Sequence, residues 1–265
     1  MLTPKDLEFV LDTARRAGQA VMEVYERDVA EQVELKADHS PLTEADKRSN
    51  ALIIEALRER FPKIPILSEE TKQVPYEERR HWSMYWLVDP LDGTKEFIKK
   101  NGEFTINIAL LQEGMPVVGV VYAPAQGRLW YGLHQLGAFA VQADGSVRRL
   151  QRGSNWRQLN HVRVVASRSH LDENTLQFVD ALRQQGKQVD FVSSGSSIKF
   201  CLVAEGQADV YPRFGPTMEW DTAAGQVIVE LTGGTVSDWQ SGQRLQYNKE
   251  NLLNPFFIVE YPAGN

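Results

Sequence analysis

Residues 86–94 read Trp86-Leu87-Val88-Asp89-Pro90-Leu91-Asp92-Gly93-Thr94, an apolar strand that runs directly into two aspartates and a Gly-Thr step. Carboxylates crowded at a strand end are unfavourable unless a cation neutralises them. Hard divalent cations such as Mg²⁺ take oxygen ligands and keep waters that a substrate phosphate can displace. The amides of Gly93 and Thr94, which precede a short helix predicted over Lys95–Lys99, suit a phosphate oxygen. The segment therefore predicts a metal and phosphate site, with an ordinary surface turn as the alternative.

Two other segments also place acids at the end of an element. Ile66-Leu67-Ser68-Glu69-Glu70 is a second apolar strand that ends in acids. Glu219-Trp220-Asp221-Thr222-Ala223-Ala224-Gly225 places Asp221 at a predicted helix start, among small residues that allow close packing. A helix cap is the alternative role for Asp221. Glu70 is not a candidate, because adjacent strand residues point to opposite faces of a sheet.

Hydrophobic periodicity places the remaining elements around these segments. Predicted helices run from Pro4 to Asp28, from Pro41 or Thr43 to Arg60, and over Glu173–Gln185, Ser196–Glu205 and Asp221–Leu231. Predicted strands cover Val33–Lys36, Ile64–Leu67, Tyr85–Val88, Ile106–Leu111, Val117–Tyr122, Leu129–Leu133, Ala138–Val141, His161–Ala166, Val189–Val192, Asp209–Tyr211 and Phe256–Glu260.

The polar stretch Gln151–Asn160 marks a change of pattern, because strands and helices alternate only after it. We therefore expect an N-terminal α+β subdomain over residues 1–152, with most of the metal ligands. A C-terminal α/β subdomain over 153–265 is expected to carry the substrate contacts and Asp221.

Composition narrows the class of protein. The 265 residues, 42% hydrophobic and 24% charged, suit one large or two small domains without extensive disorder. The net charge of −6 disfavours binding to long nucleic acid, which needs a basic surface. One cysteine, no apolar run of about 18 residues and no signal peptide lead us to expect a cytoplasmic protein without a transmembrane segment.

The three acidic segments together resemble the inositol monophosphatase superfamily of metal-dependent phosphatases. WLVDPLDGTKEF resembles the signature W-[IV]-[IV]-D-P-[IL]-D-G-T-x-x-F, and EWDTAAG resembles W-D-x-A-A-G. Ser68–Glu70 matches a G-E-E position, with Ser in place of Gly. The resemblance spans residues 1 to about 260. It implies a layered αβαβα sandwich, with an antiparallel N-terminal sheet, an α/β C-terminal half and a site in the cleft between them.

The resemblance also implies roles for individual residues. Glu69, Asp89 and the Leu91 carbonyl would hold a first metal, and Asp89, Asp92 and Asp221 a second; two or three Mg²⁺ ions are expected. Asp46 and Thr94 would position the attacking water, which makes Asp46, Glu69 and Thr94 the catalytic set. The four acids carry four negative charges, which match two Mg²⁺ ions, and two metals suit in-line phosphoryl transfer. The implied substrate contacts are Glu69, Leu91, Asp92, Gly93, Thr94, His170, Ser196, Lys199, Arg213 and Asp221.

Within the superfamily, the stretches Gly195–Arg213 and Val165–His170 resemble those of bacterial 3′(2′),5′-bisphosphate nucleotidases. Ser196 and Lys199, three apart at a predicted helix start, and Arg213 would bind a 5′-phosphate, with His170 against the nucleoside. The implied reaction removes the 3′-phosphate of adenosine 3′,5′-bisphosphate in the turnover of a sulfate-assimilation by-product. Competition by Li⁺ at the second metal site is also implied.

Two other functions stay open at this point. An inositol or sugar monophosphate phosphatase would keep the chemistry and change the substrate. A non-catalytic nucleotide-binding regulator would keep only the scaffold. Peripheral association with the inner face of the membrane, and a monomer or a homodimer, are alternatives that the sequence does not separate.

Overall fold

The computed structural model of the chain describes residues 2–27, 34–35, 41–71, 74–151, 153–167 and 172–262. Its helices are α1 Pro4–Tyr25, α2 Glu44–Arg60, α3 Tyr76–Arg79, α4 Thr94–Ile98, α5 Glu173–Gln184, α6 Ile198–Ala204 and α7 Glu219–Glu230. Its strands are β1 Glu34–Leu35, β2 Pro41–Leu42, β3 Ile66–Ser68, β4 Met84–Asp92, β5 Thr105–Gln112, β6 Met115–Ala123, β7 Arg128–Leu133, β8 Gly137–Val141, β9 Val147–Arg149, β10 His161–Ser167, β11 Gln188–Ser194, β12 Val210–Arg213, β13 Thr235–Asp238 and β14 Phe257–Glu260.

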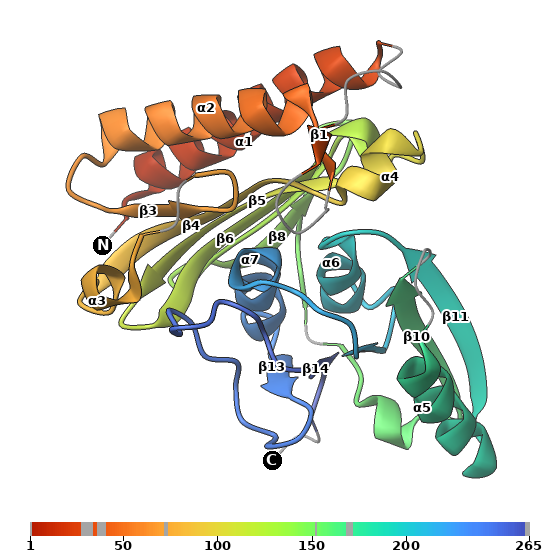
Figure 1. Cartoon of the computed structure of the whole chain (residues 1–265). Helices are drawn as coiled ribbons and strands as arrows, with labels where there is room; N and C mark the ends of the chain where they lie inside the picture. The colour runs from red at the N-terminus through yellow and green to blue at the C-terminus, as the bar shows by residue number, and fades with distance from the viewer. Residues whose placement is uncertain are drawn as a thin grey trace.

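The elements form five layers, helix–sheet–helix–sheet–helix (Figure 1). Helices α1 and α2 cover the outer face of a sheet ordered β3-β4-β5-β6-β7-β8-β9. Helices α6 and α7 fill the middle layer, and the second sheet is ordered β11-β10-β12-β14-β13, with α5 outside it. The predicted layered sandwich is confirmed. The division into subdomains at residue 152 stays a prediction; the chain passes from the first sheet to the second between Arg149 and His161.

The first sheet differs from its prediction at one edge. Strands β4 to β8 pair antiparallel as expected, and β9, a strand that the sequence analysis did not predict, continues this pattern. Strand β3, by contrast, pairs with β4 in parallel. The expectation of an antiparallel N-terminal sheet is therefore wrong for β3. The intervening helix α3, which the sequence analysis did not predict, helps to return the chain across the sheet so that both strands point the same way.

The first helix follows from local signals. Thr3 caps α1 through a capping box with Asp6, and Pro4 occupies the first helical position, where its missing N–H costs nothing. The apolar stripe from Leu7 to Val24 is buried against the first sheet. The helix ends at Tyr25, three residues before the predicted end at Asp28, which lies outside the described residues.

Helix α7 lies between the two sheets because small residues let it approach closely. A Cβ atom on Gly119 of β6 would lie 2.3 Å from the carbonyl oxygen of Ala224, and one on Gly225 would lie 2.5 Å from the ring of Phe200. These contacts bring the first turn of α7, with Asp221, to the end of β4.

Among the described residues, no helix has the length and apolar character needed to cross a membrane.

Candidate active site

Asp89 and Asp92 lie on the same face of β4 because of an irregularity in the strand. Tyr85 and Leu87 pack toward the middle layer, so alternation also directs Asp89 there. Asp89 pairs with Asn107 and Asp92 with Thr105, which leaves three steps on β4 opposite two on β5. This extra residue on β4 shifts the alternation of side chains by one position, as a β-bulge does, so that Asp92 faces the same side of the sheet as Asp89. Both carboxylates therefore face helix α7.

Asp221 completes a group of three carboxylates. It is the third residue of α7, which begins at Glu219, so the prediction that the helix begins at Asp221 is wrong by two residues. One carboxylate oxygen from each of Asp89, Asp92 and Asp221 lies within 4.8 Å of the others. Backbone amides hold two of the side chains: Leu91 N donates to Asp89 Oδ1 at 3.0 Å, and Met218 N donates to Asp221 Oδ2 at 2.8 Å.

Burial and mutual repulsion disfavour the ionised form of the three carboxylates. Burial raises the pKa of Asp89 well above its ordinary value, and the charges of Glu69, Asp92 and Asp221 raise it further. Burial likewise raises the pKa of Asp92, and the pKa of Asp221 is raised by burial and by Asp92 and Glu69. Divalent cations reverse this balance, because they bind deprotonated oxygen ligands and neutralise them. The donor set and its electrostatics therefore fit the Mg²⁺ ions that the sequence implies.

Glu69 and Leu91 line the same cavity as the three aspartates. This carboxylate cavity, of about 430 Å³, is lined by Glu69, Asp89, Leu91, Asp92, Gly93, Thr94, Lys95, Glu96, Pro216, Thr217, Met218, Asp221 and Leu253. The amide of Glu69 donates to the Val88 carbonyl at 3.1 Å, which places the residue at the end of β3 beside β4. All five predicted metal ligands thus surround one cavity, and their role as ligands stays a prediction.

Asp46 and Thr94 are in contact at the N-terminus of helix α2. Asp46 is 1% exposed, and its Oδ2 caps the helix by accepting from Thr43 N at 2.7 Å. Its other oxygen, Oδ1, accepts from the Thr94 hydroxyl at 3.3 Å. The Leu91 carbonyl is an alternative acceptor for the same hydroxyl, also at 3.3 Å. The structure thus brings together the pair that the sequence analysis proposed for positioning water.

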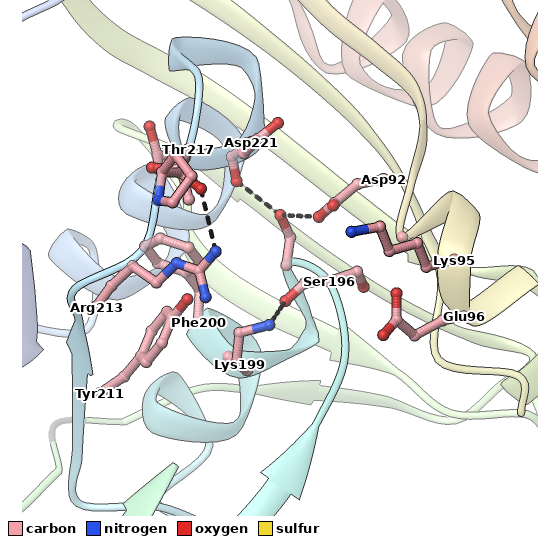
Figure 2. A pocket seen from close by; sticks show the side chains of 14 residues that line it. Asp92, Lys95, Glu96, Ser196, Lys199, Phe200, Tyr211, Arg213, Thr217 and Asp221 are labelled. Atoms are coloured by element: carbon pink, nitrogen blue, oxygen red, sulfur yellow. Dashed lines mark hydrogen bonds between the residues drawn. The ribbon is translucent and has the colours of Figure 1, made fainter. Parts of the chain in front are cut away.

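A second cavity, of about 200 Å³, adjoins the carboxylate cavity (Figure 2). This cation cavity contains Lys199, Arg213 and Ser196, the three residues predicted to bind a distal phosphate. Lys199 is 5% exposed and its Nζ donates to the Ser196 carbonyl at 2.6 Å. Within the described part of the chain, Ser196 Oγ and Arg213 Nε are buried and have no hydrogen-bond partner. Unpartnered donors beside a buried ammonium suit an anion.

The prediction for Ser196 needs correction, and the prediction for His170 stays untested. Ser196 is not helical, because α6 begins at Ile198; its φ of 45° places it in the left-handed region just before the helix. The predicted start of the helix at Ser196 is therefore wrong by two residues, although Ser196 and Lys199 both lie at the start of α6 and line the cavity. His170, the residue predicted to lie against the nucleoside, falls outside the described residues.

The structure adds residues that the sequence analysis did not select. Lys95 lines both cavities, and Figure 2 shows its ammonium directed into the cation cavity near Asp92. Ser197 lies between Asp92 and Asp221, and Asn107 lies behind it. The position of Lys95 directly after the DGT turn was a usable signal for it. Ser197 and Asn107 are 90 residues apart, and no local pattern links them.

Comparison with known proteins gives consistent matches over nearly the full length. A model of the inositol monophosphatase family matches residues 5–256. The 3′(2′),5′-bisphosphate nucleotidase CysQ of Salmonella typhimurium is 48% identical over 254 residues, which cover 96% of this chain and 98% of that protein. CysQ of Escherichia coli K12 is 47% identical over 262 residues, with the same coverage.

Solved structures agree with these relatives. A crystal structure of CysQ from Bacteroides thetaiotaomicron has a TM-score of 0.85 at 42% identity and covers 98% of both chains. An IMPase of Thermotoga maritima has a TM-score of 0.76 at 26% identity, over 97% of this chain and 92% of that one.

Proposed function

The chain belongs to the inositol monophosphatase family, and from this premise we propose that it is a Mg²⁺-dependent 3′(2′),5′-bisphosphate nucleotidase. It removes the 3′-phosphate of adenosine 3′,5′-bisphosphate and leaves AMP and phosphate. Its close relatives bear the name of this activity, at 47–48% identity over 96% of the chain. The third candidate, a non-catalytic regulator, has no support from these relatives or from the acids, which are all in place.

One observation carries the choice of substrate: the carboxylate cavity and the cation cavity share a wall. Both are lined by Asp92, Gly93, Lys95, Glu96, Pro216, Thr217 and Asp221. A substrate with two phosphates can place one beside the carboxylates and the other beside Lys199 and Arg213. A monophosphate would fill only the first. The geometry therefore favours a bisphosphate over an inositol or sugar monophosphate.

Bound divalent ions would supply Lewis acidity toward the phosphate oxygens and acidify the attacking water. The residues of the chain orient the reactants. When the Thr94 hydroxyl donates its hydrogen bond to Asp46 Oδ1, the lone pairs of Thr94 Oγ1 face away from Asp46. They can then accept a hydrogen bond from a water molecule and orient that water toward the phosphorus atom. Lys199 and Arg213 hold the distal phosphate, so that the 3′-phosphate stays in line with that water.

Thr94→Val should lower kcat by about 10²–10⁴-fold, the range in which a positioned proton-transfer group contributes. Valine keeps the shape of threonine but lacks the hydroxyl that donates a hydrogen bond to Asp46. KM should change little, because the groups that bind the phosphates remain. Steady-state phosphate release would measure both constants. Thr13→Val, which removes a buried hydroxyl bonded to the Phe9 carbonyl in α1, is the matched control and should retain full activity. A Thr94→Val enzyme with wild-type kcat would contradict the water-positioning role.

Lys199→Ala and Arg213→Ala should each raise KM for adenosine 3′,5′-bisphosphate by about 10–100-fold, because a hydrogen bond to a charged group contributes about 1.5–3 kcal/mol. Neither should change KM for inositol 1-phosphate appreciably, since a monophosphate does not reach the cation cavity. Arg183→Ala removes an exposed cation paired with Asp180 and should affect neither substrate. Equal effects on both substrates would remove the reason for preferring a nucleotide.

The pH dependence of the same KM gives an independent check. Burial lowers the pKa of Lys199 to about 8. The ammonium of the free enzyme therefore loses its proton as the pH rises through 8, and KM for the bisphosphate should rise with it. A panel of adenosine 3′,5′-bisphosphate, its 2′,5′ isomer and inositol 1-phosphate, with and without Li⁺, would complete the substrate assignment.

A further inference from the structure

Ser197 occupies a buried junction between the two cavities. It is 1% exposed, and its Oγ lies 2.9 Å from Asp92 Oδ2 and 2.7 Å from the Asp221 carbonyl oxygen. Figure 2 draws these contacts as the two dashed lines that reach Asp92 and Asp221. The Ser197 hydroxyl therefore lies between the carboxylate of Asp92 and the backbone of Asp221.

Asn107 and Thr105 determine the direction of the hydrogen bonds at Ser197. Asn107 Nδ2 donates to Ser197 Oγ at 2.9 Å, and Thr105 Oγ1 donates to Asn107 Oδ1 at 3.1 Å. Because Thr105 occupies the amide oxygen, the NH₂ group of Asn107 faces Ser197. The serine oxygen thus accepts from Asn107, and its single proton points forward to Asp92 or to the Asp221 carbonyl. Asn107 is also 1% exposed, so its bonds to Thr105 and Ser197 are buried.

The sheet register builds this chain of hydrogen bonds. Thr105 pairs with Asp92 and Asn107 with Asp89 across strands β4 and β5, so the two polar residues lie on β5 opposite the two aspartates. Ser197 itself directly precedes α6, two residues before Lys199 of the cation cavity. Asp89 and Asp221 receive amides from residues within three positions of themselves. Asp92 instead depends on a residue 105 positions away.

We propose that Ser197, held by Asn107, is a positioning residue that orients the Asp92 carboxylate for cation binding and ties it to the segment that carries Lys199. This inference rests on the proposed function, because it assumes that Asp92 binds a divalent cation. Outer residues that orient a metal ligand typically contribute about 10–100-fold in metal affinity or activity. Without the hydroxyl proton, the Asp92 carboxylate would lose the side-chain donor that fixes its rotation.

The test measures cation binding in the absence of substrate. Titration of the metal-free protein with MgCl₂ by calorimetry should show that Ser197→Ala weakens Mg²⁺ binding by about 10-fold or more. The Mg²⁺ concentration for half-maximal phosphate release should rise by a similar factor. Thr13→Val, the buried-hydroxyl control, should bind Mg²⁺ like the wild type. Unchanged Mg²⁺ affinity in Ser197→Ala, even with a lower melting temperature, would overturn the proposal.

A second variant keeps the test decisive if Ser197→Ala does not fold. Asn107→Ala leaves the serine in place but frees it to turn, so Mg²⁺ affinity should fall in the same direction by a smaller factor. Where both variants fold, the double variant should lose no more than Ser197→Ala alone, because Asn107 acts only through Ser197. Additive losses, or wild-type affinity in Asn107→Ala, would contradict the relay. A wild-type protein that neither binds Mg²⁺ nor releases phosphate would instead refute the proposed function.

Discussion

Asp92→Asn should lower kcat for phosphate release by at least about 10³-fold, since residues that merely orient a metal ligand already contribute about 10–100-fold. The amide keeps the size of the side chain but loses the negative charge and one acceptor oxygen. The effect should be large because Asp92 lines both cavities and lies within 4.8 Å of Asp89 and Asp221 through its carboxylate oxygens. Phosphate release from adenosine 3′,5′-bisphosphate at saturating Mg²⁺ measures it.

A surface aspartate provides the matched control for this substitution. Asp144 lies in the turn before β9 and accepts from the Ser146 amide at 2.8 Å, remote in the fold from the carboxylates. Asp144→Asn should leave kcat unchanged. Near-wild-type phosphate release by Asp92→Asn would show that the metal assignment is wrong, whatever the substrate.

Removal of divalent cations should abolish phosphate release and make the stability of the protein depend on pH. Burial and mutual repulsion raise the pKa values of Asp89, Asp92 and Asp221 above the ordinary value of 3.8. The folded metal-free protein therefore binds more protons than the unfolded chain, so the free energy of unfolding falls as pH rises from 3.8 through these raised values. Thermal unfolding in EDTA between pH 5 and 7.5, below the titration of Lys199, measures the slope.

Mg²⁺ should reverse this loss, because it binds the deprotonated carboxylates of the folded protein. At a free concentration 100 times its Kd, a ligand stabilises the folded state by about 2.7 kcal/mol, which corresponds to about 5–10 °C in melting temperature for a domain of this size. The shift should be larger at pH 7.5 than at pH 5. Asp92→Asn should show a smaller pH slope in EDTA. A Mg²⁺ shift that is equal at both pH values would contradict a carboxylate site.

Local patterns along the chain were sufficient for most of the fold and for the family. The capped start of α1 at Thr3 and Pro4, the apolar stripe that follows and the alternating strands each depend on residues within a few positions of one another. The segments WLVDPLDGT and EWDTAAG are equally local, and they indicate the carboxylates without any information on tertiary contacts. Such signals are readable because their physical causes, capping and periodic burial, act over one or two turns of chain.

Contacts between distant segments decided the rest. The parallel β3–β4 pairing, the bulge that brings Asp89 and Asp92 to one face, and the left-handed backbone of Ser196 have no local signature. The hydrogen bond from Ser197 to Asp92 joins residues 105 positions apart, and neither side chain indicates the other in the sequence. A buried hydroxyl acquires its role from whichever partner folding places beside it, because its hydrogen bond reaches about 3 Å and so depends on how the sheets and helices pack.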